Sequence, residues 1–193
     1  MKSNQTLLGV TVTLLVLSVI FLLIERVAGR GRNRLQPVIR RGWFTDVVYW
    51  FVTILLTKPA VRLLLLLPVG LLLLAQVTSV DALSPRAYAG FGPVSRQAVW
   101  LQAIEIYALV DFIGYWTHRR FHRGRWWPFH AVHHSSEDLD WLSSIRVHPV
   151  NDMVNKFVQA TPLLMVGFNR WVTLSAAPFF TLYAIFHHAR LNW

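Results

Sequence analysis

An uncharged apolar run near the amino terminus, Leu7 to Ile24, limits what this chain can fold into more than any other feature. As a helix its eighteen residues extend about 27 Å, just enough to cross the hydrocarbon core of a bilayer. A secretory signal peptide is the alternative, but the run is long for one, and Glu25 and Arg26 follow it without a small-residue cleavage site. The run therefore predicts a membrane helix that stays in the mature protein.

The composition agrees with a membrane protein. The chain is 54% hydrophobic and 15% charged, whereas soluble domains carry about 25% charged residues. It contains no cysteine, which excludes thiolate metal sites, iron–sulfur clusters and disulfides. The net charge of +10 would suit a nucleic-acid-binding protein, but the basic residues lie between apolar segments, as in cytoplasmic loops. We therefore expect no nucleic-acid partner, and any metal must have nitrogen and oxygen ligands.

The distribution of arginine predicts the orientation of the first helix. Six arginines lie between residues 26 and 41, whereas Lys2 is the one basic residue before the apolar run. By the positive-inside rule, the amino terminus lies outside and the arginines lie in the cytoplasm. We interpret residues 1–42 as an N-terminal transmembrane helix with a basic cytoplasmic loop, and residues 43–193 as a second membrane domain. The preference for arginine over lysine suggests a GC-rich bacterial genome, and hence the bacterial inner membrane.

Further apolar segments predict four more spans, near residues 60–75, 98–117, 150–168 and 171–186. Residues 43–57 read as an interfacial helix before the first of these spans, and residues 76–97 read as an irregular external loop. Counted from an external amino terminus, these spans place all eight histidines on the cytoplasmic side. We therefore expect an all-α, multi-pass membrane bundle of four or five spans with a histidine-rich cytoplasmic site.

Five histidines follow the 98–117 segment in two groups, His118 with His122, and His130 with His133 and His134. Residues three or four apart project from one face of a helix, so each group is predicted to converge its ring nitrogens. Neutral imidazole is the commonest metal ligand in proteins and suits iron, zinc, copper and nickel. The alternative is a solvated stretch that happens to be rich in histidine and arginine. Two groups with helical spacing favour a metal site.

Two carboxylates, Glu105 and Asp111, lie inside the apolar segment before the histidines, where an ionisable group is costly and usually functional. Asp111 lies two helical turns before His118 and therefore on the same face. Its carboxylate can accept the imidazole N–H and fix the orientation of the ring, so we predict a catalytic role for Asp111. The alternative is an ion pair with Arg119 or Arg120. No comparable positional argument applies to Glu105.

The chain resembles the fatty acid hydroxylase/sterol desaturase superfamily in two consecutive motifs. Residues 111–122 read D-x-x-x-Y-W-x-H-R-x-x-H, and residues 127–135 read W-x-x-H-x-x-H-H-S. The stretch Arg146-Val-His148-Pro149 is similar to the intermediate histidine of the family, and Phe186-His187-His188-Ala189 is similar to the histidine that precedes its last motif. The resemblance extends from about Arg40 to Trp193, so residues 43–193 are identified as a catalytic domain of this family.

The resemblance implies the chemistry. Members of the superfamily hold two non-haem iron ions at the cytoplasmic face, activate O₂ with electrons from a separate donor, and hydroxylate or desaturate a C–H bond of a membrane lipid. An unactivated C–H bond requires redox chemistry, which agrees with a metal site. The ligands that the resemblance implies are His118, His122, His130, His133, His134, His148 and His188. For His187, exposure to water or lipid headgroups without a metal is an equal alternative.

One feature of the family is missing from this sequence. Its third motif, H-x-x-H-H, does not follow His188 before the last residue, Trp193. Two metals need about eight or more ligands, and the chain has eight histidines in total. We therefore expect a truncated chain that binds at most one metal and oxidises no lipid, and an inactive remnant of the family is the alternative function. A bis-histidine haem electron carrier is a weaker alternative, because the histidines cluster outside the predicted spans. A zinc hydrolase is also weaker, because no H-E-x-x-H motif is present.

Overall fold

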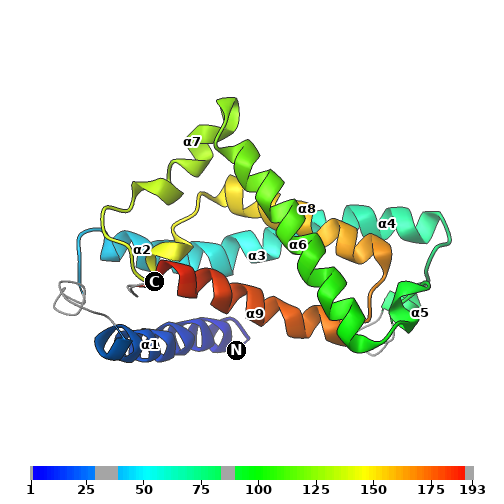
Figure 1. Cartoon of the computed structure of the whole chain (residues 1–193), viewed down its shortest axis with the longest axis horizontal. Helices are drawn as coiled ribbons and strands as arrows, with labels where there is room; N and C mark the ends of the chain where they lie inside the picture. The colour runs from blue at the N-terminus through cyan, green and yellow to red at the C-terminus, as the bar shows by residue number, and fades with distance from the viewer. Residues whose placement is uncertain (1, 29–38, 84–89, 190–193) are drawn as a thin grey trace.

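The computed structural model describes residues 2–28, 39–83 and 90–189, and within these ranges the chain is helical, with no β-strand (Figure 1). The all-α prediction is therefore confirmed. The helices are α1 (Lys2–Ala28), α2 (Trp43–Val52), α3 (Lys58–Leu64), α4 (Leu66–Leu74), α5 (Val80–Leu83), α6 (Val99–Phe121), α7 (Trp127–His130), α8 (Pro149–Val166) and α9 (Arg170–His188). Shorter turns are the π-helix η2 (Thr53–Thr57) and the 3₁₀ turns η3 (Val94–Arg96), η4 (Gly124–Trp126), η5 (His133–Ser135) and η6 (Ser143–Ile145).

Two helices of the described chain are long and apolar enough to cross a membrane, Thr6–Val27 and Trp43–Leu74. The second runs through α2, η2, α3 and α4 as one continuous helix, so the prediction of a separate interfacial helix at residues 43–57 is wrong. Pro59 does not end the helix. It directly follows the π-helical turn Thr53–Thr57, whose wider hydrogen-bonding pattern accommodates a residue without an N–H.

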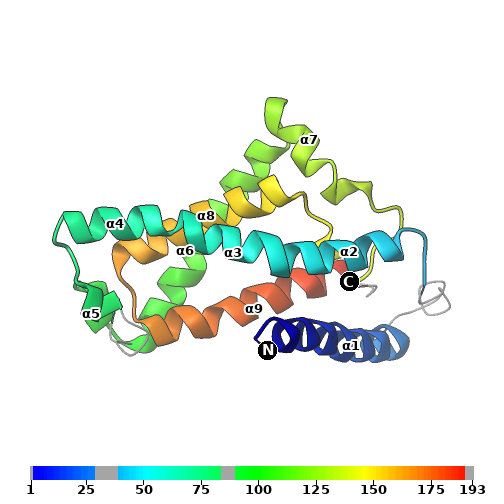
Figure 2. The same ribbon diagram turned by 180° about the vertical axis from the view of Figure 1, so that it is seen from behind.

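The other predicted spans are the helices α6, α8 and α9, which form the centre of the fold (Figure 1, Figure 2). Helix α6 packs against α8 and α9, and the long α2–α4 helix lies along the other side of α8. A Cβ atom at Gly114 would lie 3.0 Å from Nε2 of Gln159, so the glycine lets α6 and α8 approach closely. The number of membrane spans stays a prediction.

A compact polar junction joins the connections at the end of the bundle away from the histidines. Gln102, which is 1% exposed, accepts a hydrogen bond from the Asn169 backbone N–H (2.9 Å) and donates to the carbonyls of Ser95 and Gln97. These bonds tie the start of α6 to the turn between α8 and α9. From this junction α6 carries the chain to the segment that contains α7 (Figure 1).

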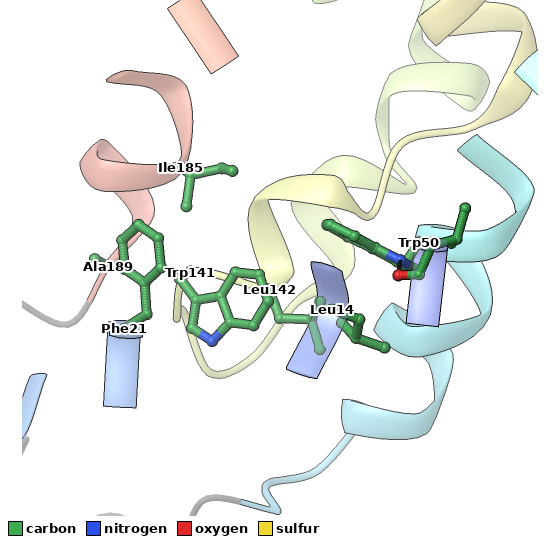
Figure 3. Packing of buried hydrophobic residues seen from close by; sticks show 8 residues of the cluster. Leu14, Phe21, Trp50, Trp141, Leu142, Ile185 and Ala189 are labelled. Carbon is green, nitrogen blue, oxygen red and sulfur yellow. Dashed lines mark hydrogen bonds between the residues drawn. The ribbon is translucent and has the colours of Figure 1, made fainter. Parts of the chain in front are cut away.

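Helix α1 is attached to the histidine-bearing part of the fold through an aromatic cluster (Figure 3). Trp141, from the connection between α7 and α8, stacks on Phe21 of α1 at a centroid distance of 5.5 Å and meets Trp50 of α2 edge to face. The indole N–H of Trp50 donates to the Val10 carbonyl (3.2 Å), which satisfies its polar group inside the cluster. Aromatic pairs in these arrangements contribute about 0.5–1.5 kcal/mol each beyond the burial of their area. The cluster therefore fixes the connection that carries the metal-binding candidates.

Candidate metal centre

The first two histidines lie at the end of α6. His118 lies in the last turn and His122 is the C-cap residue, whose backbone N–H donates to the His118 carbonyl (3.2 Å). This single helical turn brings the two Nε2 atoms within 3.0 Å of each other. The convergence predicted from the i, i+4 spacing is thus present.

The second group does not lie on one regular helix. His130 ends the short helix α7, and the chain then turns before His133 begins the 3₁₀ turn η5. As a result the Nε2 atoms of His130 and His134 lie 3.1 Å apart. His133 is turned away from them, with its Nδ1 atom beside the Arg146 carbonyl. The prediction that all three rings of this group converge on one point is wrong for His133.

Four imidazoles from the two groups form one cluster. The ligand nitrogens of His118, His122, His130 and His134 all lie within 4.8 Å of one another. An imidazole nitrogen lies about 2.0–2.1 Å from its metal, so two ligands at a right angle are about 3 Å apart. The distances of 3.0 Å and 3.1 Å in the two pairs fit this spacing. The residues therefore fit a metal ion, and an all-nitrogen donor set suits iron, zinc, copper or nickel.

The protonation states favour metal binding. Partial burial, and next the neighbouring His130, lower the pKa of His118 to about 4. Burial also lowers the pKa of His130 and of His134. At neutral pH these rings are uncharged, so their lone pairs are available to a cation.

A buried amide orients His130. The side chain of Asn151, in the first turn of α8, places Oδ1 2.9 Å from Nδ1 of His130, and the two residues are 6% and 3% exposed. Because Oδ1 only accepts, Nδ1 carries the proton and the lone pair of Nε2 points into the cluster. The sequence motifs predict no role for Asn151. The local sequence feature that could have indicated this role is its position in the helical turn that follows His148 and Pro149.

His133 and His188 form a second pair beside the four-histidine cluster. Their rings are 5.2 Å apart, and His133 is 5.6 Å from His130. Nδ1 of His133 bonds the Arg146 carbonyl (3.3 Å), and Nδ1 of His188 bonds the Ala184 carbonyl (2.9 Å). Burial, and next the neighbouring His188, lower the pKa of His133 to about 4. Since a carbonyl only accepts, both rings keep Nε2 as the nitrogen that can bind a metal.

The remaining candidates lie outside these two groups. His148 caps α8, because its Nδ1 accepts from the Val150 backbone N–H (3.1 Å), and its ring packs on Phe129. The ring of His187 packs against Tyr183. Asp111 shares the wall of a surface pocket with His118, but the contacts described for it include neither a hydrogen bond to His118 nor an ion pair with an arginine. Its catalytic role stays a prediction.

Comparison with known protein families gives one match. Residues 103–193, from the second turn of α6 to the last residue, match the model of a family described as fatty acid hydroxylase. This segment contains all eight histidines, and the match agrees with the resemblance found in the two histidine motifs. Searches of curated proteins and of solved structures gave no significant match.

Proposed function

Since residues 103–193 belong to the fatty acid hydroxylase family, we propose that this protein is a membrane-associated, O₂-dependent oxidoreductase that hydroxylates or desaturates a C–H bond of a lipid. The observation that carries the proposal is the four-histidine cluster, because its donor atoms lie close enough together to hold a metal ion. Non-haem iron bound there supplies the O₂ chemistry that an unactivated C–H bond requires.

We assign the ligands to two groups. His118, His122, His130 and His134 would hold one iron. His133 and His188 would supply part of the ligand set of a second, which needs more ligands than these two. The protein holds the rings in their binding tautomers through Asn151 and two backbone carbonyls. Aromatic side chains pack beside the cluster: Trp127 lies against His122 and His134, and buried Phe121 lies against His130, the one buried histidine of the four.

A cavity of about 700 Å³ supports a lipid substrate. It lies between α1, the α2–α3 helix, α8 and α9. Its surface is mainly apolar, and the charged residues Lys58, Asp152 and Lys156 also line it, as suits a lipid with a polar headgroup. Ala184 lines the cavity and bonds His188 through its carbonyl, and Val147, which also lines it, follows the residue whose carbonyl bonds His133. A lipid in this cavity would therefore lie close to the backbone that bonds the histidine pair.

We further propose that the histidine end faces the cytoplasm of a bacterial cell, where a separate electron donor can reach it. Arg40 belongs to the arginine-rich stretch and contacts Asp140 in the connection that follows the second histidine group. Arg40 thus lies beside the connection that follows the second histidine group. The arginine-rich stretch of the sequence is cytoplasmic by the positive-inside rule, so we place the histidines on that side as well.

The test is the metal content of matched histidine variants, purified in detergent and loaded with Fe(II). We expect His134→Ala to lose iron relative to the parent protein, because His134 completes the four-histidine cluster. His187→Ala is the control, since this ring packs on Tyr183 and should leave the iron content unchanged. Lipid oxidation is then assayed with O₂ and a reductant. Equal iron in the parent protein and His134→Ala would contradict the assignment of the cluster.

A further inference from the structure

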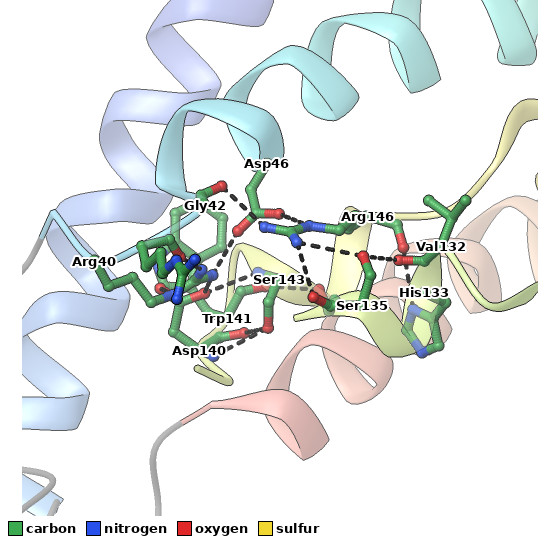
Figure 4. A network of polar contacts seen from close by, with 12 residues as sticks. Arg40, Gly42, Asp46, Val132, His133, Ser135, Asp140, Trp141, Ser143 and Arg146 are labelled. Carbon is green, nitrogen blue, oxygen red and sulfur yellow. Dashed lines mark hydrogen bonds and ion pairs between the residues drawn. The ribbon is translucent and has the colours of Figure 1, made fainter. Parts of the chain in front are cut away.

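We infer that a buried chain of charged residues, two of which precede the family-matched segment, positions His133 for metal binding. The residues are Arg40, Asp46, Asp140 and Arg146, and we call them the charge chain (Figure 4). The inference rests on the proposed metal centre, but it concerns residues that no histidine motif includes.

The charge chain is continuous and buried. The Asp46 carboxylate, with no exposed surface, accepts from Nη2 of Arg40 (2.5 Å) and from Nε of Arg146 (2.5 Å). Arg40 also makes two hydrogen bonds with Asp140, at 2.6 Å and 2.8 Å. Two positive and two negative groups balance, so the arrangement leaves no net charge with which to attract a ligand. Its contribution is geometric.

The start of α2 is shaped to receive Arg146. Gly42, the N-cap residue, has φ of 80°, a left-handed conformation that glycine adopts without strain. Its carbonyl accepts from Nη2 of Arg146 (2.9 Å), and a Cβ atom at this position would lie 2.4 Å from the same nitrogen. The glycine is therefore required both by the backbone conformation and by the approach of the guanidinium group. Asp46 lies in the first turn of α2, where a carboxylate is also favoured by the helix dipole.

Arg146 holds the second histidine group from two sides. Its guanidinium Nη1 contacts the carbonyl and hydroxyl oxygens of Ser135, both at 3.4 Å, and Ser135 lies two residues after His133. Its backbone carbonyl accepts from Nδ1 of His133 (3.3 Å). A change at Asp46 would remove the charged partner of the Arg146 side chain and leave it only neutral acceptors. We expect this to shift the Arg146 carbonyl and release the tautomer that directs Nε2 of His133 toward a metal.

A positioning role explains the charge chain better than stability alone. Buried ion pairs contribute little net stability compared with apolar side chains of similar volume, because their desolvation offsets their attraction. They do fix one geometry, since the planar guanidinium groups bond their partners in defined directions. Here the fixed geometry extends through Arg146 to His133, a candidate metal ligand.

The experiment compares Asp46→Asn with Arg41→Gln. Asp46→Asn keeps the size of the side chain but removes the charge that both arginines share. Arg41 is next to Arg40 and pairs with Glu137 at the surface, where both side chains are mostly exposed, so Arg41→Gln is a matched control. We expect iron affinity to fall about 10–100-fold in Asp46→Asn and to stay unchanged in Arg41→Gln. Arg146→Lys, which keeps the charge but not the forked geometry, should fall similarly.

A second measurement separates positioning from folding. In metal-free protein with ¹⁵N-labelled histidine, NMR should show the Nδ1–H tautomer of His133 in the parent protein and in Arg41→Gln, and a mixture of tautomers in Asp46→Asn. An unchanged tautomer or unchanged iron affinity in a folded Asp46→Asn protein overturns the inference. If Asp46→Asn does not fold, Arg146→Lys decides in the same way. If the parent protein binds no iron, the proposed function fails, while the tautomer measurement still tests the charge chain.

Discussion

Replacing Asn151 by alanine should weaken the metal centre without touching any of its ligands. The change removes the oxygen that bonds Nδ1 of His130 at 2.9 Å. Both residues are almost fully buried, so water cannot easily replace the lost acceptor. A buried donor without a partner costs about 1–3 kcal/mol, which is the expected loss in the free energy of unfolding of the metal-free protein.

The loss of metal affinity can be estimated separately. Removing a hydrogen-bond partner of a metal-bound histidine typically costs about 10–100-fold in affinity, which corresponds to about 1.4–2.8 kcal/mol. Asn151→Asp should retain most of the affinity, because a carboxylate oxygen can accept from the same N–H. Asn155→Ala, one turn later on α8, is the control, since Asn155 bonds Gln159 and no histidine.

The assay is a competition titration of Fe(II) against a chelator of known affinity, together with thermal unfolding with and without metal. The expected order of affinity is parent and Asn155→Ala first, Asn151→Asp close behind, and Asn151→Ala last. If Asn151→Ala binds iron as tightly as the parent, the hydrogen bond to His130 does not orient a ligand, and the reasoning is refuted.

Two further predictions concern stability. Trp141→Ala should lower the free energy of unfolding by about 3–5 kcal/mol, because its ring fills the cluster between Phe21 and Trp50; equal unfolding midpoints in denaturant would contradict this packing. The metal-free protein should also lose stability as the pH falls from about 6.5 to about 4, because the pKa values of His118 and His133 are lowered to about 4 in the folded state and the unfolded chain then binds more protons. Unfolding midpoints measured across this pH range, with a His133→Gln variant for comparison, should show a smaller dependence in the variant.

The sequence predicts the parts of the site that depend on local geometry. The helical segments follow from long apolar runs, and the meeting of His118 with His122 follows from one turn of helix. The direction of His133 does not follow in this way, because it depends on a carbonyl thirteen residues further along the chain. The same holds for Asn151, which lies twenty-one residues from its partner.

The predicted break in the long helix Trp43–Leu74 is wrong for a different reason. Lys58 and Pro59 looked like a break because a charge and a proline interrupt the apolar run, yet the helix passes through them without one. Sequence spacing reports the neighbours of a residue on its own helix. It does not report which backbone group another segment brings to it, or how an irregular turn accommodates a proline.

That irregular turn, the π-helix at Thr53–Thr57, divides the long helix into two parts whose side chains face different directions. Its wider turn accommodates one more residue than an α-helical turn, which rotates everything beyond it by about 100° about the axis. Before the turn, α2 faces η6 and carries Asp46; after it, α3 faces α8, and Thr57 itself bonds Asp152 (2.7 Å). Deleting a single residue within the turn would leave a more regular helix, one residue shorter and equally apolar. Such a helix would match only one of its two partners, so the irregular turn is what lets one helix contact both the histidine-bearing connection at η6 and the helix α8.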